Sequence, residues 1–407
     1  MSVLRLIAAL WLVLLPLGAL AQGFSGLARV LPDQSQLTDA GEGAALELTL
    51  SQGVPYRIFT LDEPRRVVLD FQEVDWTGFR AEEFLETEQV SDIRFGSYVP
   101  GWSRMVLELV EPMQVTSAAM DIDVVTANAR LRVQMTPADE ADFAALAGAP
   151  HDPRLDLPPP ADVEVRAPKD VDAPLLVMLD PGHGGLDPGA EAEGGVAEKN
   201  LMLEFAYELG ERLMRSGRFE VLLTREGDYF VSLERRIAMA HQQGADLFIS
   251  LHADAVTEGL AHGTVVYTLS NAASDAASAK LAERHDRADL LSGSDLSSAD
   301  DVVTDVLLDL ARQETQPRSQ ALAQSVVEAL MEQGGPVNRR PLRSAGFSVL
   351  KSADIPSVLI ELGFMSSPRD LALLIDAEWR AKAAEGIVQG ILDWREQDAA
   401  RRALIRQ

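Results

Sequence analysis

The sequence predicts two domains of different fold class, an all-β sandwich followed by an α/β domain. A chain of 407 residues is too long for one ordinary hydrophobic core. Residues 24–135 contain short runs of apolar and polar side chains in alternation, separated by turn residues, a pattern typical of a sandwich. In residues 174–396, strand-like runs alternate with helical ones, which predicts a mixed sheet flanked by helices.

The segment before the sandwich has the composition of a signal peptide. Arg5 provides a basic start, residues 6–18 are almost wholly apolar, and Ala19-Leu20-Ala21 fits an A-x-A cleavage site. The apolar run is short for a membrane span, so we favour cleavage after residue 21 over a retained anchor. Together with the absence of a wall-sorting tail, this predicts a bacterial periplasmic protein.

The composition limits which catalytic groups, metal ligands and binding partners this chain can have. Cysteine is absent, which excludes disulfides, thiolate zinc sites and cysteine nucleophiles. Any metal must therefore be held by His and carboxylate side chains. The net charge of −27, from 36 basic and 63 acidic residues, argues against nucleic acid or an anionic membrane as partner, because both need a positive surface. No later run is long and apolar enough to cross a bilayer after the signal is cleaved.

The predicted strands of the sandwich are short runs with turns between them. They are residues 45–50, 56–61, 66–71, 105–110 and 130–135. An acidic linker follows in residues 136–173, with seven prolines and no apolar periodicity. Within it, only residues 139–146 could form a helical turn.

The α/β domain contains both buried strand-like runs and amphipathic helical runs. The strands are expected at residues 175–180, 220–224, 246–251, 263–269, 347–350 and 357–362, and the helices at 200–216, 233–243 and 319–332, with one more at the C-terminal end.

Chemically useful side chains follow three of these strands. The segment Asp180-Pro-Gly-His-Gly-Gly allows a sharp backbone turn that brings His183 to the carboxyl end of its strand. His252 and Glu361 stand at the ends of two other strands, and Glu198 precedes a helix. Since α/β sites form at the carboxyl edge of a sheet, we expect these side chains to meet.

Two His and one carboxylate can hold zinc in a tetrahedral site whose fourth position takes water. A second carboxylate, which is not a ligand, would take a proton from that water and pass it to the leaving amine. Either Glu198 is the ligand and Glu361 the base, or their roles are exchanged. The helix-start position of Glu198, within reach of a metal beside His183, favours the first assignment.

Several nearby residues have plainer expected roles. We expect Arg225 and Arg236 to brace loops. Asp254 either orients a ligand or forms a structural hydrogen bond. His262 and His285 are expected to be surface residues rather than ligands.

The second domain resembles the catalytic domain of N-acetylmuramoyl-L-alanine amidases of the amidase-3 type. The matching segments occur in order along the chain: Leu179-Asp-Pro-Gly-His-Gly-Gly, Gly195-Val-Ala-Glu-Lys-Asn, Leu223-Thr-Arg, Ala245-Asp-Leu-Phe-Ile-Ser-Leu-His-Ala-Asp and Pro356-Ser-Val-Leu-Ile-Glu-Leu-Gly-Phe-Met-Ser-Ser. The resemblance implies that His183, Glu198 and His252 bind one zinc ion and that Glu361 is the catalytic glutamate. The implied reaction is hydrolysis of the amide between N-acetylmuramic acid and L-alanine in peptidoglycan, for wall remodelling and daughter-cell separation.

Residues 24–135 resemble the AMIN domain, a peptidoglycan-binding β-sandwich. The similarity lies in Phe59-Thr-Leu-Asp-Glu-Pro-Arg-Arg-Val-Val-Leu-Asp-Phe and in the runs that begin at Ile93 and Ser103. It implies that this domain targets the enzyme to the wall, with enrichment at the division septum. A small β domain with another ligand is the alternative.

Residues 271–317 interrupt the α/β pattern with two runs of helical spacing. Similar insertions in division-associated amidases contain an autoinhibitory helix, which covers the zinc site until a LytM-domain activator protein moves it. By this resemblance, Glu283 is the carboxylate expected to take the water position, with Asp286 behind it. A helical decoration packed elsewhere is the alternative.

Two other functions compete with the amidase. A zinc peptidase or carboxypeptidase acting on the stem peptide could use the same fold, because a fold alone does not determine the substrate. A catalytically inactive wall-binding scaffold would lack a ligand or the base, and the chain lacks none of the four residues.

Overall fold

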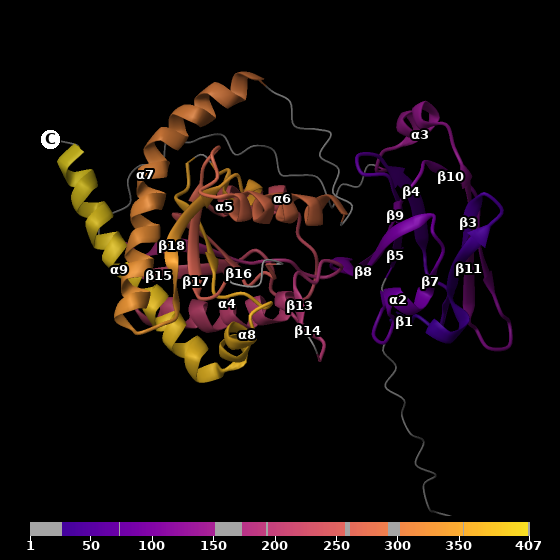
Figure 1. Cartoon of the computed structure of the whole chain (residues 1–407), viewed down its shortest axis with the longest axis horizontal. Coiled ribbons are helices and arrows are strands. Elements are labelled where there is room, and N and C mark those ends of the chain that lie inside the picture. The colour runs from indigo at the N-terminus through magenta and orange to yellow at the C-terminus, as the bar shows by residue number, and fades with distance from the viewer. Residues whose placement is uncertain are drawn as a thin grey trace, which may run out of the picture.

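The computed structural model describes residues 27–405 except 73, 151–172, 193, 257–260, 292–301 and 353. The expected signal peptide and the central part of the expected linker therefore lie outside the described residues. The N-terminal strands form one body, and the remaining strands and helices form a second, with α9 at its far end (Figure 1). Within the described residues, none of the helices combines the length and the apolar character needed to span a membrane.

The N-terminal body is a β-sandwich, as predicted. One sheet has the order β10-β11-β3-β2-β7 and the other β4-β5-β9-β8, while β1 and β6 form a separate parallel pair. The strands are β1 (Ala28–Arg29), β2 (Gln36–Ala40), β3 (Gly43–Leu50), β4 (Tyr56–Leu61), β5 (Arg66–Gln72), β6 (Val74–Asp75), β7 (Leu85–Glu86), β8 (Val90–Val99), β9 (Trp102–Leu109), β10 (Met113–Ile122) and β11 (Ala129–Pro137); the short helices are η1 (Pro32–Gln34), α2 (Ala81–Phe84) and α3 (Glu140–Leu146).

The sandwich core follows from strand alternation. In β11 the alternate residues Ala129, Leu131, Val133 and Met135 are buried while their neighbours face outward. A buried ion pair lies inside as well. Asp70 accepts hydrogen bonds from both Nε and Nη2 of Arg104, at 2.5 and 3.0 Å, and both side chains are buried. This paired geometry is what makes a buried charge tolerable.

The second body has a mixed sheet of order β15-β12-β16-β19-β17-β18, flanked by helices, which confirms the predicted fold class. Strands β15, β12, β16 and β19 are parallel, and β17 runs antiparallel to β19. The strands are β12 (Leu175–Pro181), β13 (Glu191–Ala192), β14 (Val196–Ala197), β15 (Phe219–Leu223), β16 (Leu247–His252), β17 (Thr264–Leu269), β18 (Val337–Ala345) and β19 (Ser357–Glu361); the helices are α4 (Glu198–Arg215), α5 (Leu233–Gln243), α6 (Ala276–Leu291), α7 (Val302–Glu332), η2 (Ser348–Leu350), α8 (Pro368–Ile375) and α9 (Ala377–Ile405).

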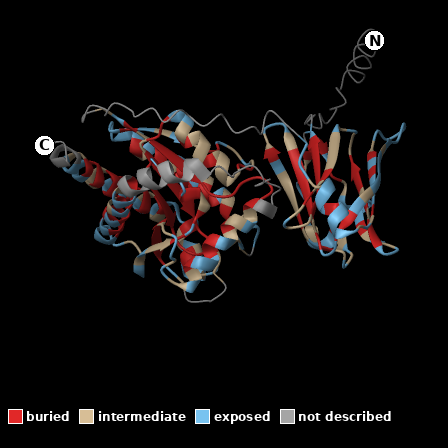
Figure 2. Cartoon of the chain, turned by 90° about the horizontal axis from the view of Figure 1, so that it is seen from above, coloured by how far each residue is buried: buried red, intermediate tan, exposed pale blue. Residues whose placement is uncertain are grey.

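Helices cover both faces of this sheet. Side chains of α4, α7 and α9 pack on one face, and those of α5, α6 and η2 pack on the other. Figure 2 shows buried residues concentrated on the strands and on the inner sides of the helices. The central strands β12, β16 and β19 are therefore enclosed on both sides, which explains their continuous apolar sequences.

Several elements differ from the sequence-based prediction. Residues 348–350 form a 3-10 helix rather than a strand. Strand β18 was not predicted, because an edge strand with the sequence VNRRPLRSA, mostly only partly buried, carries no clear apolar alternation. The predicted helix at 319–332 is the end of α7, which starts at Val302 and contains Pro317. The predicted turn at 139–146 is confirmed as α3, capped by Asp139.

Removing the carboxylate of Asp70 should destabilise the sandwich strongly. Asp70→Ala would leave the buried charge of Arg104 without its carboxylate partner, which costs about 3–5 kcal/mol. Urea unfolding followed by circular dichroism should show the loss. Asp121→Ala is the matched control, because Asp121 forms an exposed ion pair with Arg132 and its loss should change stability little. Equal effects of the two substitutions would contradict the importance of the buried pair.

Candidate metal centre

The predicted site residues meet at the carboxyl ends of three neighbouring strands. His252 is the last residue of β16, and Glu361 is the last residue of β19. The two residues lie opposite each other in the pairing of these strands. His183 lies two residues beyond the end of β12 at Pro181, and β12 pairs with β16 on the other side. The parallel register thus brings together residues that are far apart in sequence.

The loop that carries His183 is held in an unusual conformation. His183 has φ of 59°, in the left-handed region that non-glycine residues rarely adopt. A Cβ atom at Gly182 would lie 2.3 Å from Cε1 of His252, so only glycine lets the two loops approach. Arg236 donates to the carbonyl of His183 at 2.8 Å, and Arg225 donates to that of Gly182 at 2.9 Å. The prediction that these arginines brace loops is confirmed.

Glu198 lies between the two imidazole rings. Its Oε2 is 3.3 Å from Nε2 of His183, and its Oε1 is 3.2 Å from Nδ1 of His252. The side chain is fully buried, and backbone N–H groups of Ala190 and Ala253 donate to its two oxygens. Burial alone would raise the pKa of Glu198, but His183 and His252 lower it well below its usual range. The carboxylate at the start of α4 is also favoured by the helix dipole.

These three side chains fit a zinc-sized cation. In a tetrahedral site with bonds of about 2.0–2.1 Å, neighbouring ligand atoms lie about 3.3 Å apart. The separations of 3.3 and 3.2 Å match this spacing. Among the described residues, Nε2 of His183 and Nδ1 of His252 are buried without a hydrogen-bond partner, which is the arrangement expected of metal ligands.

The charges around the two rings differ. Burial opposes a charge on His183, but Asp187 and Glu198 raise its pKa well above the ordinary value. Burial, followed by the neighbouring His285, lowers the pKa of His252 to about 4. Glu198 faces the position between the rings, where a bound cation would be its direct partner, while Asp187 contacts the other nitrogen of His183.

Glu361 lies beside this group as a buried carboxyl with a free oxygen. Its Oε2 accepts a hydrogen bond from the backbone N–H of Asp254 at 3.1 Å, and its Oε1 has no hydrogen-bond partner among the described residues. Burial raises the pKa of Glu361 well above its usual range, and the charges of Asp254 and Glu198 add to the effect. A carboxyl with a raised pKa keeps its proton to higher pH than an ordinary glutamate does.

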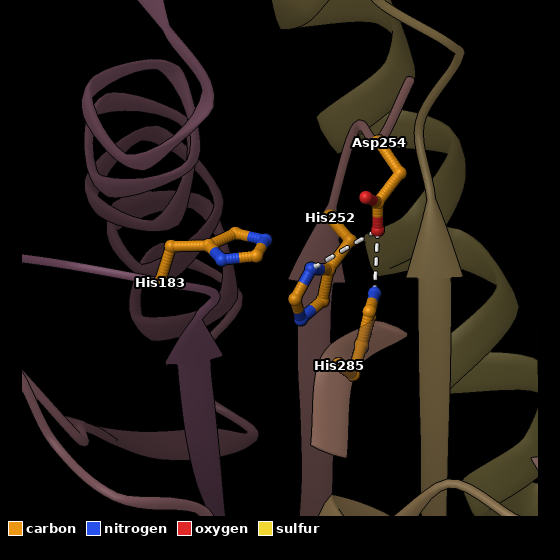
Figure 3. Close-up of side chains that lie close together, drawn as sticks. All are labelled: His183, His252, Asp254 and His285. Carbon is orange, nitrogen blue, oxygen red and sulfur yellow. Dashed lines mark hydrogen bonds and ion pairs between the residues drawn. The ribbon is translucent and has the colours of Figure 1, made fainter. Parts of the chain in front are cut away.

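A further histidine reaches the site from the insertion. His285, on α6, hydrogen-bonds to Asp254, and its ring stacks on that of His252 with centroids 4.3 Å apart (Figure 3). One potential ligand atom from each of His183, His252, Asp254 and His285 lies within 4.8 Å of the others. The expectation that His285 is a surface residue is therefore wrong, whereas His262 is exposed as predicted.

These four residues form a second possible ligand group, which shares His183 and His252 with the first. We favour the group containing Glu198, because Asp254 and His285 already satisfy each other.

The two acidic candidates of the insertion, Glu283 and Asp286, do not occupy the position beside His252 that His285 takes. Glu283 is exposed, because two residues along an α-helix correspond to about 200° of rotation, so it faces away from the site. The expectation that Glu283 reaches the metal position is therefore corrected. Asp286 is partly buried, with an Oδ1 atom that lacks a hydrogen-bond partner in the described structure. Sequence reasoning missed His285, although its helical phase matches the buried Leu281, Ala282 and Asp289.

Helix α6 also forms part of the wall of the pocket at the site. This pocket is lined by His183 and His252 from the sheet edge, by Phe230 and Arg236, and by His285 of α6, together with other residues. Asp289 of the same helix lines it too and accepts a hydrogen bond from the backbone N–H of Leu233 at 2.9 Å. Hydrogen bonds of His285 and Asp289 thus hold α6 beside the residues at the carboxyl edge of the sheet.

Comparisons with known proteins agree with both halves of the chain. A family model described as N-acetylmuramoyl-L-alanine amidase matches residues 177–393, and a model of the AMIN domain matches residues 36–135. The chain is 32% identical to the N-acetylmuramoyl-L-alanine amidase AmiC of Escherichia coli O6:H1, over 83% of this chain and 82% of the relative. It is also 32% identical to AmiC of Neisseria meningitidis serogroup B, over 85% of each chain. Among solved structures, the amidase AmiC2 of Nostoc punctiforme aligns at 28% identity with a TM-score of 0.41, over 55% of this chain and 97% of that one.

Neutralising Glu361 should stabilise the metal-free chain. Folding raises the pKa of Glu361 above 4.5, the value in the unfolded chain. The stability that protonation of this carboxyl provides is therefore complete below pH 4.5, and it is lost as the pH rises through the pKa of the folded state. Glu361→Gln keeps a neutral group there at every pH. In chelator-treated protein, we therefore expect a higher melting temperature for this variant at pH 7, with a smaller difference at pH 4.

The control for this measurement is Glu220→Gln, which changes an exposed glutamate on β15 and should leave the melting temperature nearly unchanged. A melting temperature of Glu361→Gln equal to or below that of the wild type at pH 7 would show that the buried carboxylate is not a source of instability.

Proposed function

The chain belongs to the N-acetylmuramoyl-L-alanine amidase family, and we propose that it uses zinc to hydrolyse the amide between N-acetylmuramic acid and L-alanine of peptidoglycan. The observation that carries this proposal is the buried group of His183, Glu198 and His252 with Glu361 beside it. Two imidazoles and one carboxylate are a typical donor set for a catalytic zinc ion with an open fourth position.

When bound, zinc would polarise the scissile carbonyl and activate a water molecule for attack. The chain's own residues prepare its ligands. Asp187 lies 2.8 Å from Nδ1 of His183, so it can hold the proton there and leave the lone pair of Nε2 facing Glu198. The backbone N–H groups of Ala190 and Ala253 fix the orientation of the Glu198 carboxylate.

Glu361 is assigned the proton transfers. Its free Oε1 accepts a proton from the attacking water and then donates it to the nitrogen of L-alanine as the amide bond breaks. The raised pKa supports this double role, because a carboxyl with an ordinary pKa returns a proton to the leaving nitrogen less readily near neutral pH. Exchanging the roles of Glu198 and Glu361 is less favourable, since only Glu198 lies between the two imidazoles.

The N-terminal domain is proposed to bind peptidoglycan. The support is the match of residues 36–135 to the AMIN family and the β-sandwich that these residues form. We place the enzyme in the periplasm with enrichment at the division septum, where wall cleavage would separate daughter cells.

Helix α6 is proposed to keep the resting enzyme closed. His285 stacks on the proposed ligand His252 and lines the pocket beside it, so it stands where substrate would have to approach. Arg284 donates to the carbonyl of Ala255, and Asp289 accepts from Leu233, so the helix is tethered at two points. A LytM-domain activator protein would release the site by moving α6 away.

Cleavage of dye-labelled wall should depend on zinc and on Glu361. We expect a chelator to abolish dye release, added zinc to restore it, and Glu361→Ala to lower the rate by about 10²–10⁴-fold, because the general base is lost. Glu220→Ala, at an exposed position, is the matched control. The released peptides should begin with L-alanine.

Cleavage within the stem peptide, with the lactyl amide intact, would instead support the zinc peptidase or carboxypeptidase. A Glu361→Ala protein with wild-type activity would overturn the assigned base. A wild-type protein that binds zinc but cleaves no wall, even with α6 displaced, would support the inactive scaffold.

Substituting His285 should weaken closure. His285→Ala removes the stacking on His252 and the hydrogen bond to Asp254, so we expect basal wall cleavage without an activator to rise roughly 10-fold, equivalent to about 1.4 kcal/mol of shifted equilibrium. His262→Ala, at an exposed position, is the control and should leave the rate unchanged. Unchanged or reduced cleavage by a folded His285→Ala protein would contradict the closed resting state.

A further inference from the structure

The N-terminal sandwich packs directly against the loop that carries His183. An apolar cluster joins the two domains, with Leu186 and Phe230 on the catalytic side and, on the sandwich side, Phe59, Leu61, Val68, Tyr98 and Val106. The rings of Tyr98 and Phe230 are stacked, with centroids 5.8 Å apart and an interplanar angle of 15°. Strand β8 of the sandwich faces the catalytic domain in Figure 1, in agreement with these contacts.

The backbones of the two domains also touch at this point. The N–H of Leu186 donates to the carbonyl of Ser97 on β8 at 3.2 Å. A Cβ atom at Gly185 would lie only 1.8 Å from that same oxygen, so a side chain at position 185 would push the domains apart. The second glycine after His183 therefore has a role in docking the sandwich as well as in turning the loop.

A chain of polar contacts leads from β8 to the metal centre. Nη1 of Arg94 lies 3.8 Å from Oδ1 of Asp187, and Oδ2 of Asp187 lies 2.8 Å from Nδ1 of His183. The Asp187 side chain is 9% exposed and that of Arg94 23%, so the sandwich shields this ion pair from most of the solvent. The N–H of Gly189 donates to the same Oδ1 of Asp187 at 3.2 Å and helps to hold the carboxylate in place.

We propose that the N-terminal domain is an outer part of the metal centre, in which Arg94 acts as a positioning residue for the ligand His183 through Asp187. The proposal rests on the zinc site of the proposed function. A carboxylate that orients a metal-bound histidine typically changes metal affinity by 10–100-fold when it is lost. Arg94 acts one contact further out, so its effect on zinc affinity should lie near the lower end of that range.

An ordinary surface ion pair would behave differently. Exposed pairs contribute about 0–1 kcal/mol to stability and have no specific effect on a distant ligand. Arg132 forms such a pair with Asp121 on the other sheet of the sandwich, and its side chain is 47% exposed. Comparing substitutions of Arg94 and Arg132 therefore separates a role in positioning the ligand from a general effect of losing an arginine.

The test measures zinc binding by the full mature chain in competition with a chromophoric chelator. We expect Arg94→Ala to lower zinc affinity about 10-fold and Arg94→Lys to recover part of the loss, because lysine keeps the charge without the planar fork. Arg132→Ala should bind zinc like the wild type. In cobalt-substituted protein, the visible absorption bands should shift in Arg94→Ala and not in Arg132→Ala, since those bands report ligand geometry.

The inference is overturned if Arg94→Ala matches Arg132→Ala in zinc affinity and in the cobalt spectrum, or if both variants lose affinity equally. Failure of the proposed function is recognised separately, because it appears in the wild type. A wild-type chain that binds zinc without cleaving wall defeats the proposed reaction, while the affinity of Arg94→Ala still decides the role of Arg94. A wild-type chain that binds no zinc overturns both.

Discussion

Glu198 lies fully buried between two imidazoles, and Glu361, another fully buried carboxyl, lies close enough for their charges to interact. Two buried acids in one place are tolerated only when protons or a cation balance their charge. The nearby arginines do not serve this purpose, because Arg225 and Arg236 donate to backbone carbonyls and to Asp180. A cation bound between the imidazoles would supply this balance, and the surrounding structure holds the proposed ligand side chains in place.

Three parts of the chain converge on the same short loop. The parallel strands bring His183 and His252 to one sheet edge, α6 adds His285 above it, and β8 of the sandwich reaches Asp187 behind it. Helix α6 and the sandwich also contact each other, since Arg287 donates to Glu108 at 3.0 Å. In this arrangement α6, the sandwich and the loop that carries His183 are linked to one another by direct contacts.

Sequence reasoning identified the parts of the site that depend on local pattern. His183, His252 and Glu361 each follow a buried apolar run, and parallel strands align their ends at one edge. The contacts that depend on tertiary packing were not predicted. His285 was assigned to the surface because its burial depends on how α6 docks, and β18 is an edge strand without apolar alternation. The contact of Arg94 with Asp187 joins two domains and leaves no periodic signal in either.

The central claim is that His183, Glu198 and His252 hold zinc, and anomalous X-ray scattering at the zinc absorption edge tests it most directly. In crystals of the zinc-loaded chain, we predict one anomalous peak at about 2.0–2.2 Å from Nε2 of His183, from Glu198 and from Nδ1 of His252. A peak between Asp254 and His285 without contact to Glu198, or no peak in this region, would contradict the claim.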